Sequence, residues 1–360
     1  MSATIDRSTW KRVRLGEALT NVGWCNYSHL QPRQVRKVTQ GDDTGEVSIT
    51  TDYYHPASPV VLFGDHTCNV KYVDFDCLIL GDGVKLLTPN HEVFSTRFLY
   101  YLVQYVASKL PQGYARHLAV LKETECVLPC YEDQFKIANA ITSIDTHISA
   151  LQALIAKYEA IKKATVNLLL KPKAGWERVK LGDVAVTSSG GTPNRSNEGY
   201  YQGTIPWFTT SELHDEVLYD SKEHISEEAL QKTTAKVFPA GTLLLAMYGA
   251  TIGKLGVLAK PAATNQACCA IKCGSNVETA FLFQVLINRR QELVALGCGA
   301  GQPNISQQIV QNLSLVLPPL SEQRKIAEQI SAIDKVLADY KAQLEEARQL
   351  KAGMMSYFFG

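Results

Sequence analysis

The sequence has 360 residues, of which 46% are hydrophobic and 20% charged, a composition that suits a folded protein with room for two domains. Its formal net charge of +1 at pH 7 excludes a chain that binds nucleic acid through bulk positive charge alone. No window approaches about eighteen uncharged apolar residues, and the N-terminal segment lacks an apolar core. We therefore expect neither a membrane span nor a signal peptide, and a cytoplasmic protein.

Residues 1–131 are predicted to form a first mixed α/β module. Short apolar runs such as 59–63 and 76–80 alternate with Gly/Asp turns, which is typical of β-strands, and residues 96–108 read as a helix. The basic side chains of this module are candidates for contacts with phosphate or guanine, while an ordinary solvated surface stays the alternative. These candidate DNA-binding residues are Lys85, Arg116, His117 and Lys122.

Residues 132–175 are predicted to form a long helix and a linker. Pro129 stands just before the helix, and Pro172 and Gly175 mark its end. Apolar residues occur at alternating steps of four and three, which is a heptad seam, and so narrow a seam needs a helical partner. The seam positions are 137, 141, 144, 148, 151, 155 and 158.

Residues 176–319 are predicted to form a second mixed module, with an apolar strand at 241–248 and a helix near 278–296. The loops at 188–195 and 299–306 are polar and glycine-containing, so they are candidates for groove recognition. Gln and Asn can read adenine edges through two hydrogen bonds, whereas the alternative at 299–306 is a cap on the following element through Asn304 and Ser306. The candidate DNA-binding residues here are Arg195, Lys254, Gln302 and Asn304.

Two further features of the second module have an ordinary structural interpretation. The segment 249–256 is rich in glycine but lacks the spacing of a phosphate-binding loop, so a tight turn between strands is favoured. Trp207 is expected in the core rather than on the surface as a base-stacking platform.

Residues 320–360 are predicted to form a second long helix, and its heptad seam repeats that of the first. Residues 127–145 read VLPCYEDQFKIANAITSID and residues 316–334 read VLPPLSEQRKIAEQISAID, an offset of 189 (316 − 127). A second echo relates WKRVRLG at 10–16 to WERVKLG at 176–182, an offset of 166 (176 − 10). The chain is thus built as module, helix, module, helix, which implies a pseudo-two-fold molecule.

Matching seams predict that the two helices pack on each other as an antiparallel coiled coil, the alternative being that each packs on its own module. A two-fold protein suits a two-fold target, and duplex DNA is the obvious one. The charge counts oppose autonomous tight binding, because Lys plus Arg against Asp plus Glu is 13 to 13 in residues 1–130 and 11 to 12 in residues 176–320. A partner would then supply most of the phosphate contacts.

No catalytic constellation is evident in the sequence. There is no nucleophile elbow, no zincin motif and no Walker A motif, and the nine cysteines lack metal-finger spacing. We expect free buried thiols in a reducing compartment, no metal site, and a chain that is not an enzyme by itself.

The chain resembles the DNA-specificity subunits of Type I restriction–modification systems over nearly its whole length. Module one departs from module two because it lacks the GGTP loop, which predicts that the two modules read different sequences. The resemblance rests on these segments: Gly190–Pro193, Gly203–Trp207, Tyr248–Gly253, Asn265–Gln266, Gly301–Ser306 and Leu317–Ala327, with Phe63–Thr67, Gly81–Lys85 and Gly113–His117 in the first half.

The resemblance implies that each module is a target recognition domain that reads one half of a bipartite, asymmetric site. It implies that the two helices set the spacer between the half-sites and dock two methyltransferase subunits, which bind adenosylmethionine. Restriction subunits that use ATP and Mg²⁺ would join that core, although a modification-only assembly is equally compatible with the sequence. No cofactor is expected in this chain.

Two other classes of protein were weighed. A fused adenine methyltransferase would need an Asn/Asp-Pro-Pro-Tyr/Phe motif, whereas residues 317–320 read Leu-Pro-Pro-Leu. A coiled-coil adaptor that does not bind DNA would not need the recognition loops, and the resemblance disfavours it.

Overall fold

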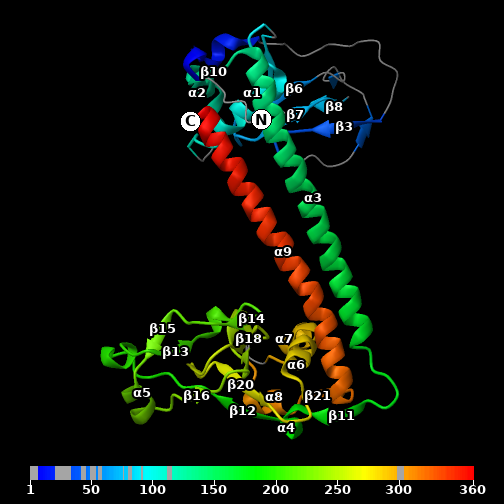
Figure 1. The fold of residues 1–360 in the computed structure, drawn as a ribbon, viewed down its shortest axis with the longest axis vertical. Helices are drawn as coiled ribbons and strands as arrows, with labels where there is room; N and C mark the ends of the chain where they lie inside the picture. The colour runs from blue at the N-terminus through cyan, green and yellow to red at the C-terminus, as the bar shows by residue number, and fades with distance from the viewer. Residues whose placement is uncertain are drawn as a thin grey trace. The chain divides into compact units, whose positions relative to one another are not determined.

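The computed structural model describes the whole chain except residues 1–6, 21–33, 42–45, 49–53, 56–58, 76, 80–82, 91, 112–115 and 298–303. It divides into two compact units, which we call unit 1 (Met1–Leu154 with Tyr340–Gly360) and unit 2 (Ile155–Asp339). Two long helices, α3 (Tyr131–Leu169) and α9 (Leu320–Phe359), each contribute to both units (Figure 1). Helix α3 starts one residue before the predicted helix-and-linker segment 132–175 and ends within it, and α9 matches the predicted helix 320–360 to within one residue.

Unit 1 contains a two-stranded ribbon and two four-stranded sheets. The ribbon pairs β1 (Lys11–Arg14) with β10 (Glu125–Leu128) in antiparallel fashion. One sheet has the order β2-β9-β6-β7 and the other has the order β4-β3-β8-β5. The bounds are β2 (Leu19–Thr20), β3 (Gln34–Val38), β4 (Glu46–Ser48), β5 (Tyr54–His55), β6 (Val60–Gly64), β7 (Val70–Val73), β8 (Cys77–Ile79) and β9 (Val84–Pro89), with helices η1 (Arg7–Thr9), η2 (Leu15–Ala18), α1 (Thr96–Ala107) and α2 (His117–Glu123).

Helix α1 fills the core of unit 1. Ser95 begins it by accepting a hydrogen bond from the Phe98 backbone N–H at 3.2 Å. Its apolar face is fully buried together with strand β6, every residue of which is buried. The end of α9 closes the same core, where the rings of Phe98 and Phe359 lie 5.3 Å apart. The first module therefore shares its core with the last turns of the chain.

Unit 2 repeats the plan of unit 1. The ribbon pairs β11 (Glu177–Lys180) with β21 (Ser314–Leu317), and the two sheets have the orders β12-β20-β17-β18-β14 and β15-β13-β19-β16. The bounds are β12 (Ala185–Ser189), β13 (Ile205–Phe208), β14 (Glu216–Leu218), β15 (Glu223–Ile225), β16 (Val237–Phe238), β17 (Leu243–Ala246), β18 (Leu255–Leu258), β19 (Ala262–Thr264) and β20 (Cys268–Cys273), with helices α4 (Leu181–Val184), η3 (Glu198–Tyr201), η4 (Thr210–Glu212), α5 (Glu227–Lys232), η5 (Gly249–Thr251), α6 (Thr279–Asn288), α7 (Arg290–Ala295) and α8 (Gln307–Gln311).

The two units share one topology. Strands β2, β9, β6 and β7 correspond in order and pairing to β12, β20, β17 and β18. Strands β4, β3, β8 and β5 correspond in the same way to β15, β13, β19 and β16. Strand β14 is an addition at the edge of the larger sheet of unit 2. The fold class expected from the sequence, two mixed modules with two long helices and an internal repeat, is therefore confirmed.

One predicted element differs from the structure. The helix expected near 278–296 is two helices, α6 and α7, because Arg289 leaves the helical conformation at φ −98° and ψ 13°. Its guanidinium donates to the Ser314 backbone O at 2.6 Å and pairs with Glu292. This break depends on a strand that lies 25 residues further along the chain, which a local pattern does not report.

The long helices pack antiparallel to each other within each unit. In unit 1, Asp145 of α3 pairs with Lys351 of α9 at 2.7 Å, while the earlier Ile137 shares a core with the later Met355. In unit 2, Lys162 of α3 pairs with Asp334 of α9. Asp145 and Asp334 are equivalent in the repeat, as are Lys162 and Lys351, so each unit holds the same ion pair with the roles of the helices exchanged.

The first turns of each long helix pack on their own module, which was the alternative to helix–helix packing. Ile137 and Ile141 of α3 are buried in the core of unit 1, and their equivalents Ile326 and Ile330 of α9 are buried in the core of unit 2. Each helix therefore begins in the core of the module that precedes it and then pairs with the other helix.

Candidate nucleic-acid interface

Four loops that are distant in the sequence meet at one surface of unit 2. The Met247 backbone donates to the Ala267 O at 2.9 Å, and the Ile305 backbone donates to the Met247 O at 2.9 Å. The Ser189 hydroxyl donates to Gln307 Oε1 at 3.2 Å, which joins the end of β12 to helix α8. We call this surface the loop face of unit 2, formed by residues 188–193, 247–251, 264–267 and 304–307.

Two glycines allow the first of these loops to lie against the backbone of its neighbours. A Cβ at Gly190 would lie 2.1 Å from the Thr264 O, and a Cβ at Gly191 would lie 2.5 Å from the backbone of Thr234. The Gly191 O accepts from Trp207 Nε1 at 2.9 Å. Trp207 is buried beneath the loop, so the expectation that it belongs to the core is met and the loop is supported from below.

Arg195 is engaged by an acidic partner. Its guanidinium makes two hydrogen bonds with Glu223 and lies 4.3 Å from the centre of the Tyr201 ring. The Arg195 hydrogen bonds hold the pKa of the Glu223 carboxyl below its usual value. Glu223 occupies the Nη1 and Nη2 donors that face it, so Arg195 is held in place and its charge is balanced before any DNA contact.

Lys254 follows a tight turn that is fixed from two sides. Gly253 has a φ of +80°, and its backbone O accepts from Arg290 Nε at 2.9 Å. Asp215 accepts from the Leu255 backbone N–H at 3.0 Å and lies 3.8 Å from the Lys254 ammonium. Residues 249–256 therefore form the turn into a strand that was favoured over a phosphate loop, and the Lys254 charge is partly balanced by Asp215.

Asn304 is exposed beside an aromatic residue that is not among the candidate DNA-binding residues of the sequence. An antiparallel bridge joins Asn304 to Tyr248, whose side chain is 44% exposed. Ser306 caps helix α8 by accepting from the Ile309 backbone at 3.2 Å, which realises part of the capping alternative. Gln302 lies outside the described residues. The signal for Tyr248 is its place at the start of the glycine-rich turn, where an aromatic ring is difficult to bury.

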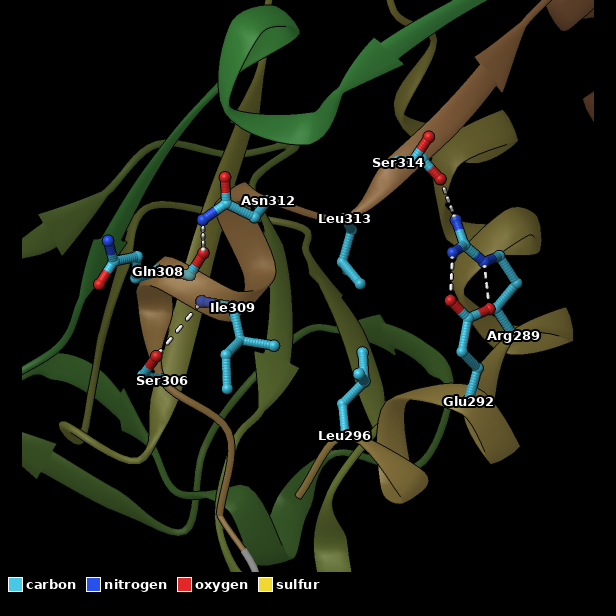
Figure 2. Close-up of a pocket in the computed structure, with 9 residues that line it drawn as sticks. All are labelled: Arg289, Glu292, Leu296, Ser306, Gln308, Ile309, Asn312, Leu313 and Ser314. Carbon is cyan, nitrogen blue, oxygen red and sulfur yellow. Dashed lines mark hydrogen bonds and ion pairs between the residues drawn. The ribbon is translucent and has the colours of Figure 1, made fainter. Parts of the chain in front are cut away.

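The pocket beside α8 is a less suitable place for a nucleic-acid phosphate. It has a volume of about 430 Å³. Figure 2 shows its only charged pair, in which both sides of the Arg289 fork are turned to the Glu292 carboxylate, with a third contact to Ser314. Its charge is thus balanced within the pocket. The lining residues are Arg289, Glu292, Leu296, Ser306, Gln308, Ile309, Asn312, Leu313 and Ser314.

Unit 1 builds an equivalent surface with other side chains. The Asp65 backbone donates to the Gly83 O at 2.7 Å, and the Asp65 O accepts from the His117 backbone at 3.1 Å. The Asp65 carboxylate also accepts from the Leu118 backbone at 2.7 Å. Asp65 thus makes the same two backbone contacts as Met247, with Gly83 in place of Ala267 and His117 in place of Ile305. The next residue, His66, therefore corresponds to Tyr248, and Arg116, which precedes His117, corresponds to Asn304. We call this surface the loop face of unit 1, formed by residues 64–67, 83 and 116–118.

The structure brings only some of the predicted residues of unit 1 to this surface. Arg116 is exposed on it, and Lys85 is half-buried in β9 opposite Phe63, two residues after Gly83. His117 is adjacent to Arg116, but its side chain is only 3% exposed and so offers little surface to a duplex. Lys122 lies at the other end of α2, where its backbone packs against Gly16.

Among the residues that the structure describes, none of the helices is long and apolar enough to cross a membrane. The same part of the chain contains no cluster of three or more His, Cys, Asp or Glu residues placed to hold a metal ion. Seven cysteines in the described ranges are free, and burial raises the pKa of the Cys269 thiol to about 12. Cys25 and Cys298 lie outside these ranges.

Two alike modules, each closed by the start of one long helix and carrying its own loop face, define a protein built from a duplicated module and a long helix. Residues 173–347 match the family described as "Type I restriction modification DNA specificity domain", so this part of the chain carries a domain of that family.

Curated relatives of the chain are specificity subunits of Type I restriction enzymes. The chain is 22% identical to the Type I restriction enzyme EcoR124I/EcoR124II specificity subunit of Escherichia coli, over 85% of this chain and 80% of that protein. It is 26% identical to the MjaIX specificity subunit of Methanocaldococcus jannaschii over 51% of this chain and 44% of that one.

Similarity to solved structures supports the same fold. The Type I restriction–modification S subunit from M. genitalium matches with a TM-score of 0.67 at 13% identity, covering 100% of this chain and 98% of that one. A chain from a study of complex assembly and conformational transition of the type I R-M system matches with a TM-score of 0.59 at 18% identity, covering 96% of each.

Proposed function

We propose that this chain is the subunit that selects the DNA sequence in a Type I restriction–modification complex, each module reading one half of a bipartite, asymmetric site. The observation that carries the proposal is the pair of loop faces. The same backbone contacts present Tyr248 and Asn304 in unit 2 but His66 and Arg116 in unit 1. The backbone framework is the same in both units but the side chains differ, and side chains are what contact the base edges. The two modules are therefore suited to half-sites of different sequence.

The long helices are proposed to set the spacer between the half-sites and to dock two methyltransferase subunits. Neither module is basic overall, and Arg195 and Lys254 already face acidic partners. The methyltransferase subunits would therefore supply most of the phosphate contacts. They would also bind adenosylmethionine and take the target adenine out of the base stack.

The chain itself is proposed to be non-catalytic and to act in the cytoplasm, where the chromosome lies. Restriction subunits that use ATP and Mg²⁺ are the further partners of this proposal, and a modification-only assembly would lack them. The cofactors of the complex would then belong to the partner chains.

Methylome sequencing of a host that expresses this chain with its methyltransferase subunit tests the proposal. We expect N6-methyladenine in both halves of one bipartite motif, and loss of that methylation when this chain is deleted. Methylation that persists without the chain would exclude a role in specificity and would favour the adaptor that does not bind DNA.

A further inference from the structure

A buried glutamine joins module one to its long helix. Gln134 is 1% exposed, and its amide group makes three hydrogen bonds. Its Oε1 accepts from the Ser95 backbone at 2.9 Å, and its Nε2 donates to the Val93 O at 2.8 Å and to the Pro129 O at 3.2 Å. Ser95 is the N-cap of α1 and Pro129 follows β10, so one side chain ties the module's main helix and its ribbon to the start of α3.

The same joint recurs in unit 2. Gln323 is also 1% exposed; its Oε1 accepts from the Glu278 backbone at 2.9 Å, and its Nε2 donates to the Asn276 O at 3.0 Å and to the Pro318 O at 2.9 Å. Glu278 is the N-cap of α6, as Ser95 is of α1. Two of the three partners differ in side chain between the units, and the third is a proline in both, but all three contribute the same backbone groups. The joint therefore depends on main-chain atoms and not on the side chains that the modules vary.

A second attachment lies three turns further along each helix. In unit 1, the Tyr101 hydroxyl of α1 donates to Asp145 at 2.9 Å, and Lys351 of α9 pairs with the same carboxylate. In unit 2, Gln284 of α6 donates to Asp334 at 3.5 Å, and Lys162 pairs with it. The two attachments are eleven residues apart on the helix, or roughly 16 Å at about 1.5 Å per residue.

Two directional attachments fix the angle between each module and its long helix, which apolar packing alone does not. Ile137 and Ile141 bring the helix against the core, but apolar contact has no directional preference. Hydrogen bonds weaken steeply as their angles depart from linearity, so the amide and the carboxylate resist rotation of the module about its helix. Neither attachment includes a residue of a loop face.

We propose that Gln134 and Gln323, helped by Asp145 and Asp334, are positioning residues that hold each recognition module at one angle on its long helix and so determine how sharply the protein selects spacer length. This proposal rests on the proposed function. The glutamines contact no base in it, because they are buried inside each unit away from the loop faces.

The test varies the spacer while both half-sites stay constant. The full chain in complex with its methyltransferase subunits is offered duplexes that carry the motif found by methylome sequencing, with spacers up to two base pairs shorter or longer. Binding and methylation are measured for each duplex. The variants are Gln134→Met, which keeps the shape of the side chain but removes all three hydrogen bonds, and Gln231→Met, the same change at an exposed position of α5, outside the long helices and the loop faces.

We expect Gln134→Met to reduce the preference for the best spacer over its neighbours by about five- to tenfold, the effect of roughly one lost net hydrogen bond. The sequence read in each half-site should stay unchanged, and Gln231→Met should behave as the parent protein. If Gln134→Met does not fold, Tyr101→Phe takes its place. This change removes the hydrogen bond of the second attachment while keeping the ring, and it should broaden the spacer profile less than Gln134→Met would.

Two results would overturn the inference. A spacer profile as sharp as that of the parent would show that the joint does not set the angle. An equal loss of binding at every spacer would show that Gln134 only stabilises the fold. Absence of any bipartite motif with the parent protein is a separate outcome, since it would contradict the proposed function itself.

Discussion

At the scale of single residues, the duplicated chain offers an internal control for each contact. Trp176 Nε1 donates to Glu322 at 3.2 Å, and Lys173 pairs with the same carboxylate at 2.8 Å. The equivalent residues in the first half are Trp10, Asp133 and Arg7. Among the described residues, no hydrogen-bond acceptor lies against the buried Trp10 Nε1, and Asp133 instead pairs with Lys136 at 3.2 Å. The shorter acid is the physical difference between the two sites.

We therefore expect Asp133→Glu to stabilise unit 1 by about 1 kcal/mol, because the added methylene lets the carboxylate reach the unpaired Trp10 N–H. Denaturant unfolding of the full chain measures this change. The reciprocal variant Glu322→Asp should lower the stability of unit 2. The contradicting result is an unchanged unfolding midpoint for Asp133→Glu together with a lowered midpoint for Glu322→Asp. It would mean that the longer carboxylate of the Asp133→Glu variant does not reach Trp10.

The Arg195–Glu223 pair predicts a dependence of stability on pH. Hydrogen bonds from Arg195 hold the pKa of Glu223 below its ordinary value of 4.5. Because the folded-state pKa is depressed, the pair stabilises the fold above pH 4.5, and this contribution is lost as the pH falls through the folded-state value.

The matching experiment compares the parent protein with Glu223→Gln in denaturant titrations from about pH 6 to about pH 3. We expect the parent to be more stable at the upper end and the difference to shrink towards the lower end. A constant difference across this range would mean that the ionised carboxylate contributes nothing.

At the scale of elements, the long helices were the most predictable part of the chain, because a heptad seam is a local pattern that needs only sequence to be read. The turn at 249–256 was likewise correctly preferred over a phosphate loop. The break between α6 and α7 was missed, since Arg289 is drawn out of the helix by a strand further along the chain.

The helices also carry a prediction about spacing. Inserting four residues into α3 between Leu154 and Ile155, where the two compact units divide, lengthens the helix by about 6 Å, near two base pairs. We expect a new preferred spacer and unchanged half-sites, measured by methylome sequencing. An unchanged spacer would contradict the role of the helices as the element that sets it.

At the scale of the whole molecule, the repeat makes each module separable in function. Exchanging residues 10–130 for the first module of another member of the family should change one half-site and leave the other as it was. The reason is that each loop face is built by backbone contacts within its own unit. Methylome sequencing of the exchanged protein measures both halves at once, and a change in both would mean that the modules do not read independently.

The sequence by itself determined the repeat, the two long helices, the mixed modules and the family resemblance. Periodicity, glycine-rich turns and duplicated motifs can all be read from the order of the residues, without knowledge of tertiary contacts. Only the tertiary structure decided which candidate side chains are available. It buried His117, paired Arg195 with Glu223, placed Tyr248 beside Asn304 and used Gln134 and Gln323 as joints. These outcomes depend on hydrogen bonds and burial between segments that lie tens of residues apart, and no local pattern encodes such contacts.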